Sequence, residues 1–415
     1  AHEIDANMHE ENDHPKICVC VRKRPLNDKE RTKLDHDSVT CLNPVVWVHS
    51  SKLRVDGISK YLDHSNYCFD HAFSEDVSTK DVYRHSTMPL VEFVVSDHGG
   101  RATVFAYGQT GSGKTYTMQG IQSMVAEDLF LLLSGNTGSD SACSLDNVLV
   151  TVSFFEIYGG VIQDLLNERN RLKLLEDGKG EVVISGLEEY EAHSPDEFLA
   201  LIEEGNKKRT TQRTEANDTS SRSHAICQIL LRDKKNDKMR GKLSLVDLAG
   251  SERGADTKSH DKLRRTESSD INTSLLALKE CIRALGSGGS KRHVPYRASK
   301  LTLILKDCFT SKYAKTTMIA TVSPSSSSAD HTLNTLRYAN RIKEKKLTSV
   351  LKSKKQKKQT EANRPPPETP DIGASSSYKD DMSVVAYSTE EEMLAESDEF
   401  EEALEEEEEE EEEEE

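Results

Sequence analysis

Short apolar runs alternate with longer segments of mixed polarity between Lys16 and about Lys346. This alternation is typical of an α/β domain, in which strands and helices follow one another along the chain. Cys18 and Cys20 alternate with valines in the first run, so we expect both on one face of a strand. Strands are expected over Ile17–Val21, Ala102–Tyr107, Val148–Tyr158, Ala225–Leu231, Leu243–Asp247 and Thr317–Val322.

The clearest helix is expected over Ile271–Leu285. Five apolar residues recur there at spacings of four, three, four and three, which places them on one stripe that should be buried. The other side carries Lys279, Glu280 and Arg283, which by themselves indicate only a solvated helix face. The apolar stripe consists of Ile271, Leu275, Leu278, Ile282 and Leu285.

The two ends of the chain differ in composition from its middle. Eight lysines lie between Lys343 and Lys358, three prolines follow, and the chain closes on eleven consecutive glutamates. Such segments cannot bury enough apolar surface to offset the entropy lost on ordering. We therefore expect four parts: a disordered N-terminal segment at 1–14, a folded domain at 15–346, a basic linker at 347–359 and a disordered acidic tail at 360–415.

Charge divides in the same way. Residues 361–415 hold 24 acidic and two basic side chains, so residues 1–360 carry +5 of the total net charge of −17. A mildly basic body suits an acidic partner surface, and the tail suits solvent or a basic patch.

The eight cysteines are scattered, without Cys-x-x-Cys spacing or nearby histidines, which favours a reducing, intracellular compartment over a disulfide framework or zinc site. No apolar stretch approaches the length needed to cross a membrane, so we expect a cytosolic chain. It begins with Ala rather than Met, which leaves open whether its natural N-terminus is present.

A phosphate-binding loop is predicted directly after the expected strand Ala102–Tyr107, because GQTGSGKT fits G-x-x-x-x-G-K-[ST]. Its glycines let successive backbone N–H groups turn toward phosphate oxygens, and the following helix would present its positive end to the same anion. Lys114 would reach the β- and γ-phosphates, and the Thr115 hydroxyl would bind Mg²⁺. The candidate nucleotide-binding residues of this loop are Gly108, Gln109, Thr110, Gly111, Ser112, Gly113, Lys114 and Thr115.

Two further polar segments indicate a hydrolytic site. Asp247–Glu252, which reads DLAGSE, follows a buried-looking strand, so Asp247 is expected to act on the metal. Asn217–His224, which reads NDTSSRSH, supplies hydroxyls and a cation. Each segment alone is weak evidence for a hydrolytic site, since a Ser-rich loop is usually only a loop and an Asp after a strand is often a helix cap. Together with the phosphate loop they predict nucleotide hydrolysis.

GQTGSGKT, SSRSH and DLAGSE, in this order, resemble the phosphate loop, switch I and switch II of kinesin motor domains. The segment Arg22-Lys23-Arg24-Pro25 is similar to the family's adenine-binding Arg-x-Arg-Pro, Tyr116 stands where the family stacks a ring on the base, and 293–302 resembles its microtubule-facing loop. The resemblance covers about 16–346. It implies a P-loop NTPase fold of the α/β class, with a central, mostly parallel twisted sheet flanked by helices, and it implies ATP and Mg²⁺ as cofactors.

The resemblance also implies a role for each site residue. Ser220 and Ser221 would close over the γ-phosphate and Mg²⁺, and the backbone of Gly250 would sense that phosphate. Arg222 and Glu252 would form an ion pair between the switches, with Glu252 accepting the proton passed on from the attacking water. The implied catalytic residues are Lys114, Ser221, Arg222, Gly250 and Glu252, and the implied metal ligands are Thr115, Ser221 and Asp247, with Arg22, Arg24, Pro25 and Tyr116 at the base.

Three segments are most similar to the kinesin-13 group, which takes microtubule ends apart: KLRVD at 52–56, KECIRAL at 279–285 and SERGADT at 251–257. Three positions differ from the family pattern: Glu267–Ser274 lacks a glycine and a lysine, and Gly159 replaces an asparagine. The implied tubulin contacts are Arg54, Val55, Asp56, Lys279, Glu280, Arg283, His293, Tyr296, Arg297 and Lys300.

We therefore expect a microtubule-stimulated ATPase that depolymerises microtubule ends. A translocating motor and a catalytically weak microtubule binder remain alternatives, while a non-motor P-loop enzyme would leave 293–302 unexplained. Tubulin is the expected partner, with no nucleic acid and no membrane, and the cytoplasm and the microtubule cytoskeleton, including the spindle, are the expected location. The absence of sustained heptads gives no argument for a coiled coil and leaves the oligomeric state open.

Overall fold

The computed structural model describes most of the expected folded domain. The predicted linker, acidic tail and N-terminal segment lie outside the described residues, as do Val55, Ser220 and His293, so those assignments stay predictions. The described residues are 15–54, 56, 58–96, 100–135, 143–178, 182–210, 221–252, 262–286, 294–311 and 313–343.

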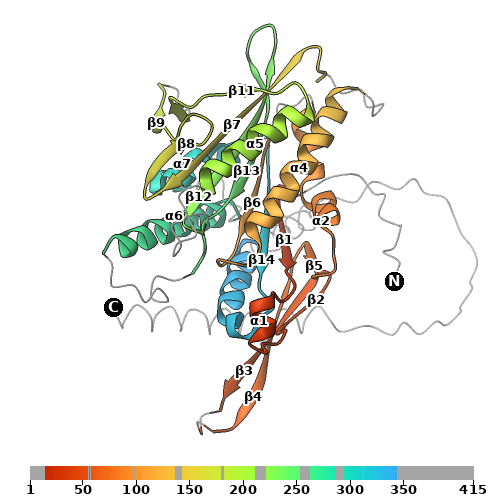
Figure 1. Cartoon of the computed structure of the whole chain (residues 1–415), viewed down its shortest axis with the longest axis vertical. Helices are drawn as coiled ribbons and strands as arrows, with labels where there is room; N and C mark the ends of the chain where they lie inside the picture. Colours follow the sequence, from red (N-terminus) through yellow and green to blue (C-terminus); the bar gives the residue numbers. More distant parts are fainter. Residues whose placement is uncertain are drawn as a thin grey trace, which may run out of the picture. The chain divides into compact units, whose positions relative to one another are not determined.

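Eleven strands of this described part form one sheet (Figure 1). In sheet order they are β10 (Val182–Ser185), β9 (Arg171–Glu176), β8 (Val161–Asp164), β7 (Val148–Tyr158), β12 (Ser223–Asp233), β13 (Met239–Asp247), β6 (Arg101–Tyr107), β14 (Ala314–Val322), β1 (Ile17–Lys23) and β5 (His71–Phe73), with β11 (Tyr190–Glu191) paired to β7. All six strands expected from the sequence are present, most of them extended by a few residues.

The sheet is mixed, whereas we expected it to be mostly parallel. The half formed by β13, β6, β14, β1 and β5 is parallel, and the half from β7 to β10 pairs antiparallel. Short connections explain the second half, because a tight turn can join only antiparallel neighbours. Gly159 (φ 52°) and Gly160 (φ 70°) make such a two-residue turn between β7 and β8.

Helices cover both faces of the sheet and enclose two apolar cores. One core gathers residues of α2 (Thr79–Ser86), α3 (Met88–Val95), α4 (Lys114–Leu133) and α5 (Pro195–Thr210), and in Figure 1 α4 and α5 lie in front of the sheet. Cys18 and Cys20 point into this core and Val19 and Val21 into the other, as the predicted alternation requires.

The second core lies under α6 (Lys262–Gly286), which contains the predicted helix and begins nine residues before it. Leu275, Leu278 and Ile282 are buried as the stripe predicted. The same core takes side chains from the short helices α7 (Lys300–Ile304) and α8 (Lys306–Thr310) and from a helix over 329–343. The turns η3 (Tyr296–Ala298) and η4 (Ser326–Ser328) precede α7 and that last helix.

A separate three-stranded sheet of β2 (Val39–Leu42), β3 (Val45–Leu53) and β4 (Lys60–Cys68) follows the short α1 (Asp28–Thr32). Its β3–β4 hairpin extends beyond β2 to a free tip, seen at the bottom of Figure 1. The sequence analysis expected no strand here, and the structure has two of nine residues each. Among the helices that the structure describes, none is long and apolar enough to span a bilayer.

Candidate active site

The phosphate loop lies between the middle strands of the parallel half of the sheet. β6 runs between β13 and β14 and ends at Tyr107, and α4 begins at Lys114, so the loop fills the turn at the carboxyl end of β6. This is where α/β sheets bind ligands. Gly108 must be glycine, because a Cβ there would overlap the carbonyl oxygen of Thr321, and Gly113 has a φ of 103° as it caps α4.

Lys114 is buried over the loop that precedes it. Its Nζ donates to the carbonyl oxygens of Gly108 at 2.8 Å and Gln109 at 2.9 Å. These two bonds hold the ammonium group at the centre of the loop. The predicted cation therefore lies where phosphate oxygens would be bound.

Thr115 and Asp247 come together as predicted. The Thr115 hydroxyl donates to Asp247 Oδ2 at 2.7 Å, and the other carboxylate oxygen, Oδ1, is buried with no partner among the described residues. A buried carboxylate oxygen without a partner requires an explanation, and oxygen ligands of this kind are what Mg²⁺ prefers. These two residues therefore fit a magnesium site. Ser221 is half-buried, and its place among the metal ligands stays a prediction.

Arg209 is a site residue that the sequence analysis missed. It lies in the last turn of α5 and is 3% exposed. Its Nη1 is 2.6 Å from Asp247 Oδ2, and its Nη2 donates to the carbonyl oxygen of Ser223 at 3.2 Å. The guanidinium thus fixes the Asp247 carboxylate against the start of β12. Nothing in the run Lys207-Lys208-Arg209 distinguishes the buried cation from the exposed Lys207 and the half-buried Lys208.

The two switch segments contact each other and the phosphate loop. The Gly250 amide donates to the carbonyl oxygen of Ser221 at 2.7 Å, and the Ser251 amide donates to the Gly108 carbonyl at 3.2 Å. The Glu252 carboxylate accepts hydrogen bonds from the backbone N–H of Thr110, at 3.2 Å, and from its hydroxyl. Switch II is therefore attached to both the loop and switch I.

Glu252 and Arg222 were expected to pair across the switches. In the described part of the chain the Glu252 carboxylate is hydrogen-bonded to Thr110, and the ion pair with Arg222 stays a prediction. Gly250 has no room for a side chain, because a Cβ there would overlap the Glu252 carboxylate and lie 2.5 Å from Thr110 Oγ1. The glycine lets this carboxylate lie close to the loop.

His224, the last residue of switch I, is buried at the start of β12. Its Nδ1 accepts the amide of Ala249 at 3.1 Å, and its Nε2 lies 2.8 Å from Ser274 Oγ in α6. Burial, and then the charge of Arg209, lowers the pKa of His224 to about 3, so the ring is neutral at physiological pH. The sequence analysis gave this residue no role of its own.

The residues expected at the nucleotide base lie beside the loop. Arg22 donates to the hydroxyls of Thr79 at 2.7 Å and Thr117 at 3.0 Å, and its guanidinium carbon is 5.4 Å from the ring centre of Tyr116. Burial lowers the pKa of Arg22. The Tyr116 side chain is 69% exposed, which leaves room for a second planar group on its ring.

Arg24 supports the loop. Its Nε donates to the carbonyl oxygen of Gly111 at 2.7 Å, its Nη1 donates to that of Pro25, and its Nη2 pairs with Glu30 at 2.6 Å. A contact of Arg24 or Pro25 with the base stays a prediction.

Most of the predicted microtubule residues lie on α6, η3 and α7, which pack together. Lys279 and Glu280 are half-buried, and Arg283 is exposed and pairs with Glu280 at 2.8 Å. Arg297 stacks on Tyr296 at 5.3 Å. The three elements therefore carry these side chains on one connected part of the molecule.

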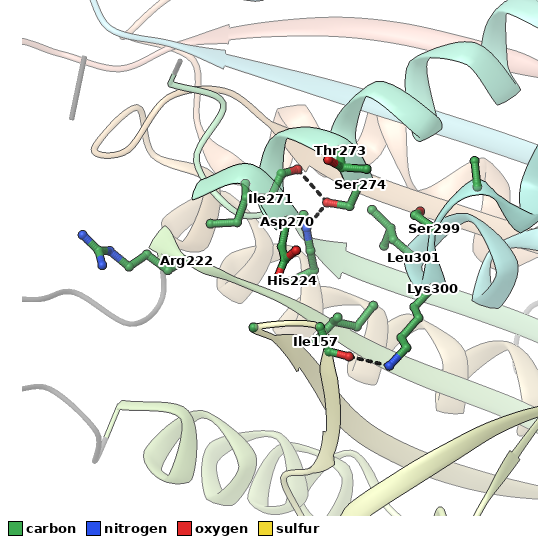
Figure 2. Close-up of a pocket in the computed structure, with 13 residues that line it drawn as sticks. Ile157, Arg222, His224, Asp270, Ile271, Thr273, Ser274, Ser299, Lys300 and Leu301 are labelled. Carbon is green, nitrogen blue, oxygen red and sulfur yellow. Dashed lines mark hydrogen bonds between the residues drawn. The ribbon is translucent and has the colours of Figure 1, made fainter. Parts of the chain in front are cut away.

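Two basic residues of this part are tied to the sheet. Arg297 Nε lies 3.1 Å from Glu176 Oε2 at the end of β9. Figure 2 shows Lys300 reaching the β7–β8 turn, where it donates to the carbonyl oxygen of Gly160. Strands β8 and β9, which the sequence analysis did not predict, thus help to position the predicted contact residues.

Arg54 and Asp56 are exposed at the tip of the β3–β4 hairpin. The Asp56 carboxylate accepts the backbone amides of Ile58 at 2.9 Å and Ser59 at 2.8 Å, and its hydrogen bonds, those with Ser59 first, lower its pKa. Asp56 therefore builds the turn, as an Asp in a turn commonly does. Arg54 lies at the same tip, and these hydrogen bonds of the turn do not involve its side chain.

Comparisons with known proteins agree with this geometry. The family model for the kinesin motor domain matches residues 22–345. Over 333 residues, 80% of this chain, the sequence is 63% identical to the diatom spindle kinesin-1 of Cylindrotheca fusiformis, and because the match covers 51% of that relative, the chain spans about half of its length. The narrower resemblance to the kinesin-13 group finds no support in either match. The motifs, the fold and both matches together show that this chain belongs to the kinesin motor-domain family, whose members are microtubule-stimulated ATPases.

Proposed function

We propose that this protein hydrolyses ATP between the phosphate loop and the two switch segments, and that microtubules stimulate the hydrolysis. The observation that supports this most is the contact among the three segments: Gly250 on Ser221, Ser251 on Gly108, and Glu252 on Thr110. A phosphate gained or lost at the loop acts on both switches at once. Such a contact gives the two-state behaviour by which nucleotide hydrolysis is converted into movement.

The site fits a magnesium nucleotide. The amides of the loop and Lys114 would hold the phosphates, Thr115 and Asp247 would hold the metal, and Arg22 with Tyr116 would contact the base. Mg²⁺, when bound, neutralises charge on the transferred phosphoryl group and its leaving oxygen. The unpartnered Oδ1 of Asp247 is the structural reason for placing the metal there.

The Gly250 amide is the group through which the site would register the γ-phosphate. It donates to the neutral carbonyl oxygen of Ser221 at 2.7 Å. A phosphate oxygen is charged and accepts a stronger hydrogen bond, so it competes for this amide. Exchange of one acceptor for the other would separate or join the two switches. Glu252 would then take up the proton passed on from the attacking water.

The microtubule would bind along α6, η3 and α7. Lys279, Arg283, Arg297 and Lys300 place cationic groups on this part, and a basic surface suits the acidic surface of tubulin. The relative named a spindle kinesin supports the microtubules of the spindle as the place of action. Its likeness also favours a motor that moves along microtubules over one that only shortens them.

Microscopy of labelled, stabilised microtubules tests this proposal. We expect surface-bound protein to move the filaments in the presence of ATP, and the Glu252→Ala variant to hold them without movement. Filaments that remain unbound, or that bind without ATP-dependent movement or shortening, would contradict the proposal.

End shortening is a second candidate, which the β3–β4 hairpin favours. The hairpin carries the exposed Arg54 on two nine-residue strands, and a charged tip of this kind could select bent tubulin at a filament end. Arg54→Ala should then reduce shortening and leave basal ATP turnover unchanged. Lys238→Ala, an exposed cation in the β12–β13 turn, is the matched control. Asp56 is left intact, because its carboxylate holds the turn.

A further inference from the structure

Two hydrogen bonds of the His224 ring connect switch II to α6, and a third continues from Ser274 to the backbone of that helix. The Ala249 amide donates to Nδ1 at 3.1 Å, Nε2 lies 2.8 Å from Ser274 Oγ, and the Ser274 hydroxyl contacts the carbonyl oxygen of Ile271 at 2.7 Å. Figure 2 shows the last two of these bonds as dashed lines. We call this set, from Ala249 through His224 and Ser274 to Ile271, the histidine bridge.

The direction of each bond follows from its chemistry. A backbone amide can only donate, so Nδ1 of His224 must be the unprotonated nitrogen. The neutral ring then carries its proton on Nε2 and donates it to the Ser274 hydroxyl, which gives its own proton to the Ile271 carbonyl. Every donor and acceptor in the bridge is thus used once.

The bridge begins beneath the phosphate site. Charges of Arg209, Asp247 and Lys114 all act on the His224 ring, which is 3% exposed. Ser274 is also buried. Leaving a polar group unpaired at such a depth is unfavourable, so the bonds resist separation when either end is displaced.

The α6 end of the bridge borders a cavity of about 200 Å³. His224, Ile271 and Ser274 line one part of it, and Ser299 and Leu301 line another. Because this turn of α6 is not fully packed on that side, hydrogen bonds contribute strongly to its position. The cavity also gives the turn room for a second arrangement, which a tightly packed core would resist.

We propose that His224 is a positioning residue that links the movement of switch II to α6. A displacement of the Ala249 amide would be passed through the ring to Ser274, and then along the helix to Lys279 and Arg283. These residues lie five and nine positions further along α6, and nine residues of helix span about 14 Å. The inference rests on the proposed microtubule-stimulated ATPase and adds the contact through which the stimulation travels.

Ser274→Ala removes the α6 end of the bridge without touching the nucleotide site. We expect basal ATP turnover to stay within about twofold of the parent protein, and the maximal stimulation by microtubules to fall about tenfold or more. Ser274→Thr keeps the hydroxyl and has room for its methyl group beside the cavity, so it should restore stimulation. Thr273→Ala is the matched control, because Thr273 is exposed and its hydroxyl donates to the carbonyl oxygen of Ser269 rather than to the bridge.

These experiments distinguish a failure of the histidine bridge from a failure of the proposed function. Stimulation of Ser274→Ala as strong as that of the parent, an equal loss in Thr273→Ala, or no recovery in Ser274→Thr would overturn the bridge. A parent protein that microtubules do not stimulate would contradict the proposed function instead. The bridge would then be tested by measuring amide hydrogen exchange in α6 with and without ATP. A nucleotide-dependent change in exchange that persists in Ser274→Ala would overturn the bridge. A change that is present in the parent and lost in Ser274→Ala would support it.

Discussion

Replacing Arg209 by Met should destabilise the fold more than any change of an exposed cation on the same helix. The substitution keeps an unbranched side chain of similar reach but removes the guanidinium from Asp247, 2.6 Å away, and from Ser223. Asp247 is 6% exposed, so its charge would remain buried, with the Thr115 hydroxyl as its remaining hydrogen-bond partner within the described part of the chain. Breaking a buried ion pair from one side costs about 3–5 kcal/mol.

Urea denaturation in the absence of nucleotide measures this loss. For a domain of this size, with an m-value of at least about 3 kcal/mol/M, we expect the midpoint to fall by roughly 1 M. Lys207→Met is the control: its side chain is 76% exposed and its ion pair with Glu203 is 3.6 Å long, so the loss should stay below about 0.5 kcal/mol.

A second substitution tests the reasoning itself. Asp247→Asn added to Arg209→Met removes the buried carboxylate charge that the single variant leaves without its ion-pair partner. The double variant should therefore regain at least half of the lost stability. An Arg209→Met variant within about 1 kcal/mol of the parent would refute the argument. A double variant no more stable than Arg209→Met would show that the loss has another cause.

Three further predictions concern other parts of the chain. The folded pKa of His224, about 3, lies below its unfolded value, so the unfolded chain takes up the proton first and stability falls by about 1.4 kcal/mol per pH unit below about pH 6.5. His224→Gln should lose less stability between pH 6 and 5 than the parent, and equal slopes in acid titrations would contradict this. Gly250→Ala would push the Glu252 carboxylate off Thr110, so ATP turnover should fall about 100-fold while ATP still binds, and near-normal phosphate release would count against it. Deleting 360–415 removes 24 acidic side chains and should tighten microtubule binding at low salt, which equal affinities in co-sedimentation would disprove.

The nucleotide site could be predicted because its residues either lie close together in the sequence or lie at the ends of neighbouring strands. The loop at Gly108–Thr115 is contiguous, and its contact with Asp247 follows once β6 and β13 are parallel neighbours. Arg209 could not be found in this way. Its burial depends on where the end of α5 meets β12, and that is a property of packing rather than of the run of cations in which it lies.

The short strands of the antiparallel half escaped prediction for a related reason. β8, β10 and β11 have two to four residues each, too few to show a period of alternation. The sequence alone could not assign Asp56 to the turn, because a turn and a binding tip use the same residue types. The bonds to Ile58 and Ser59 show that it holds the turn, and its contact with tubulin stays a prediction.

The central claim is that one site, built by the phosphate loop and the switches, hydrolyses ATP faster on a microtubule. Steady-state phosphate release, with and without polymerised tubulin, measures this directly for the parent and for Lys114→Ala. We expect a low basal rate that rises and saturates with microtubule concentration in the parent, and no turnover above background in Lys114→Ala, which lacks the ammonium held over Gly108 and Gln109. A parent rate that microtubules leave unchanged, or a Lys114→Ala rate equal to that of the parent, would contradict the claim.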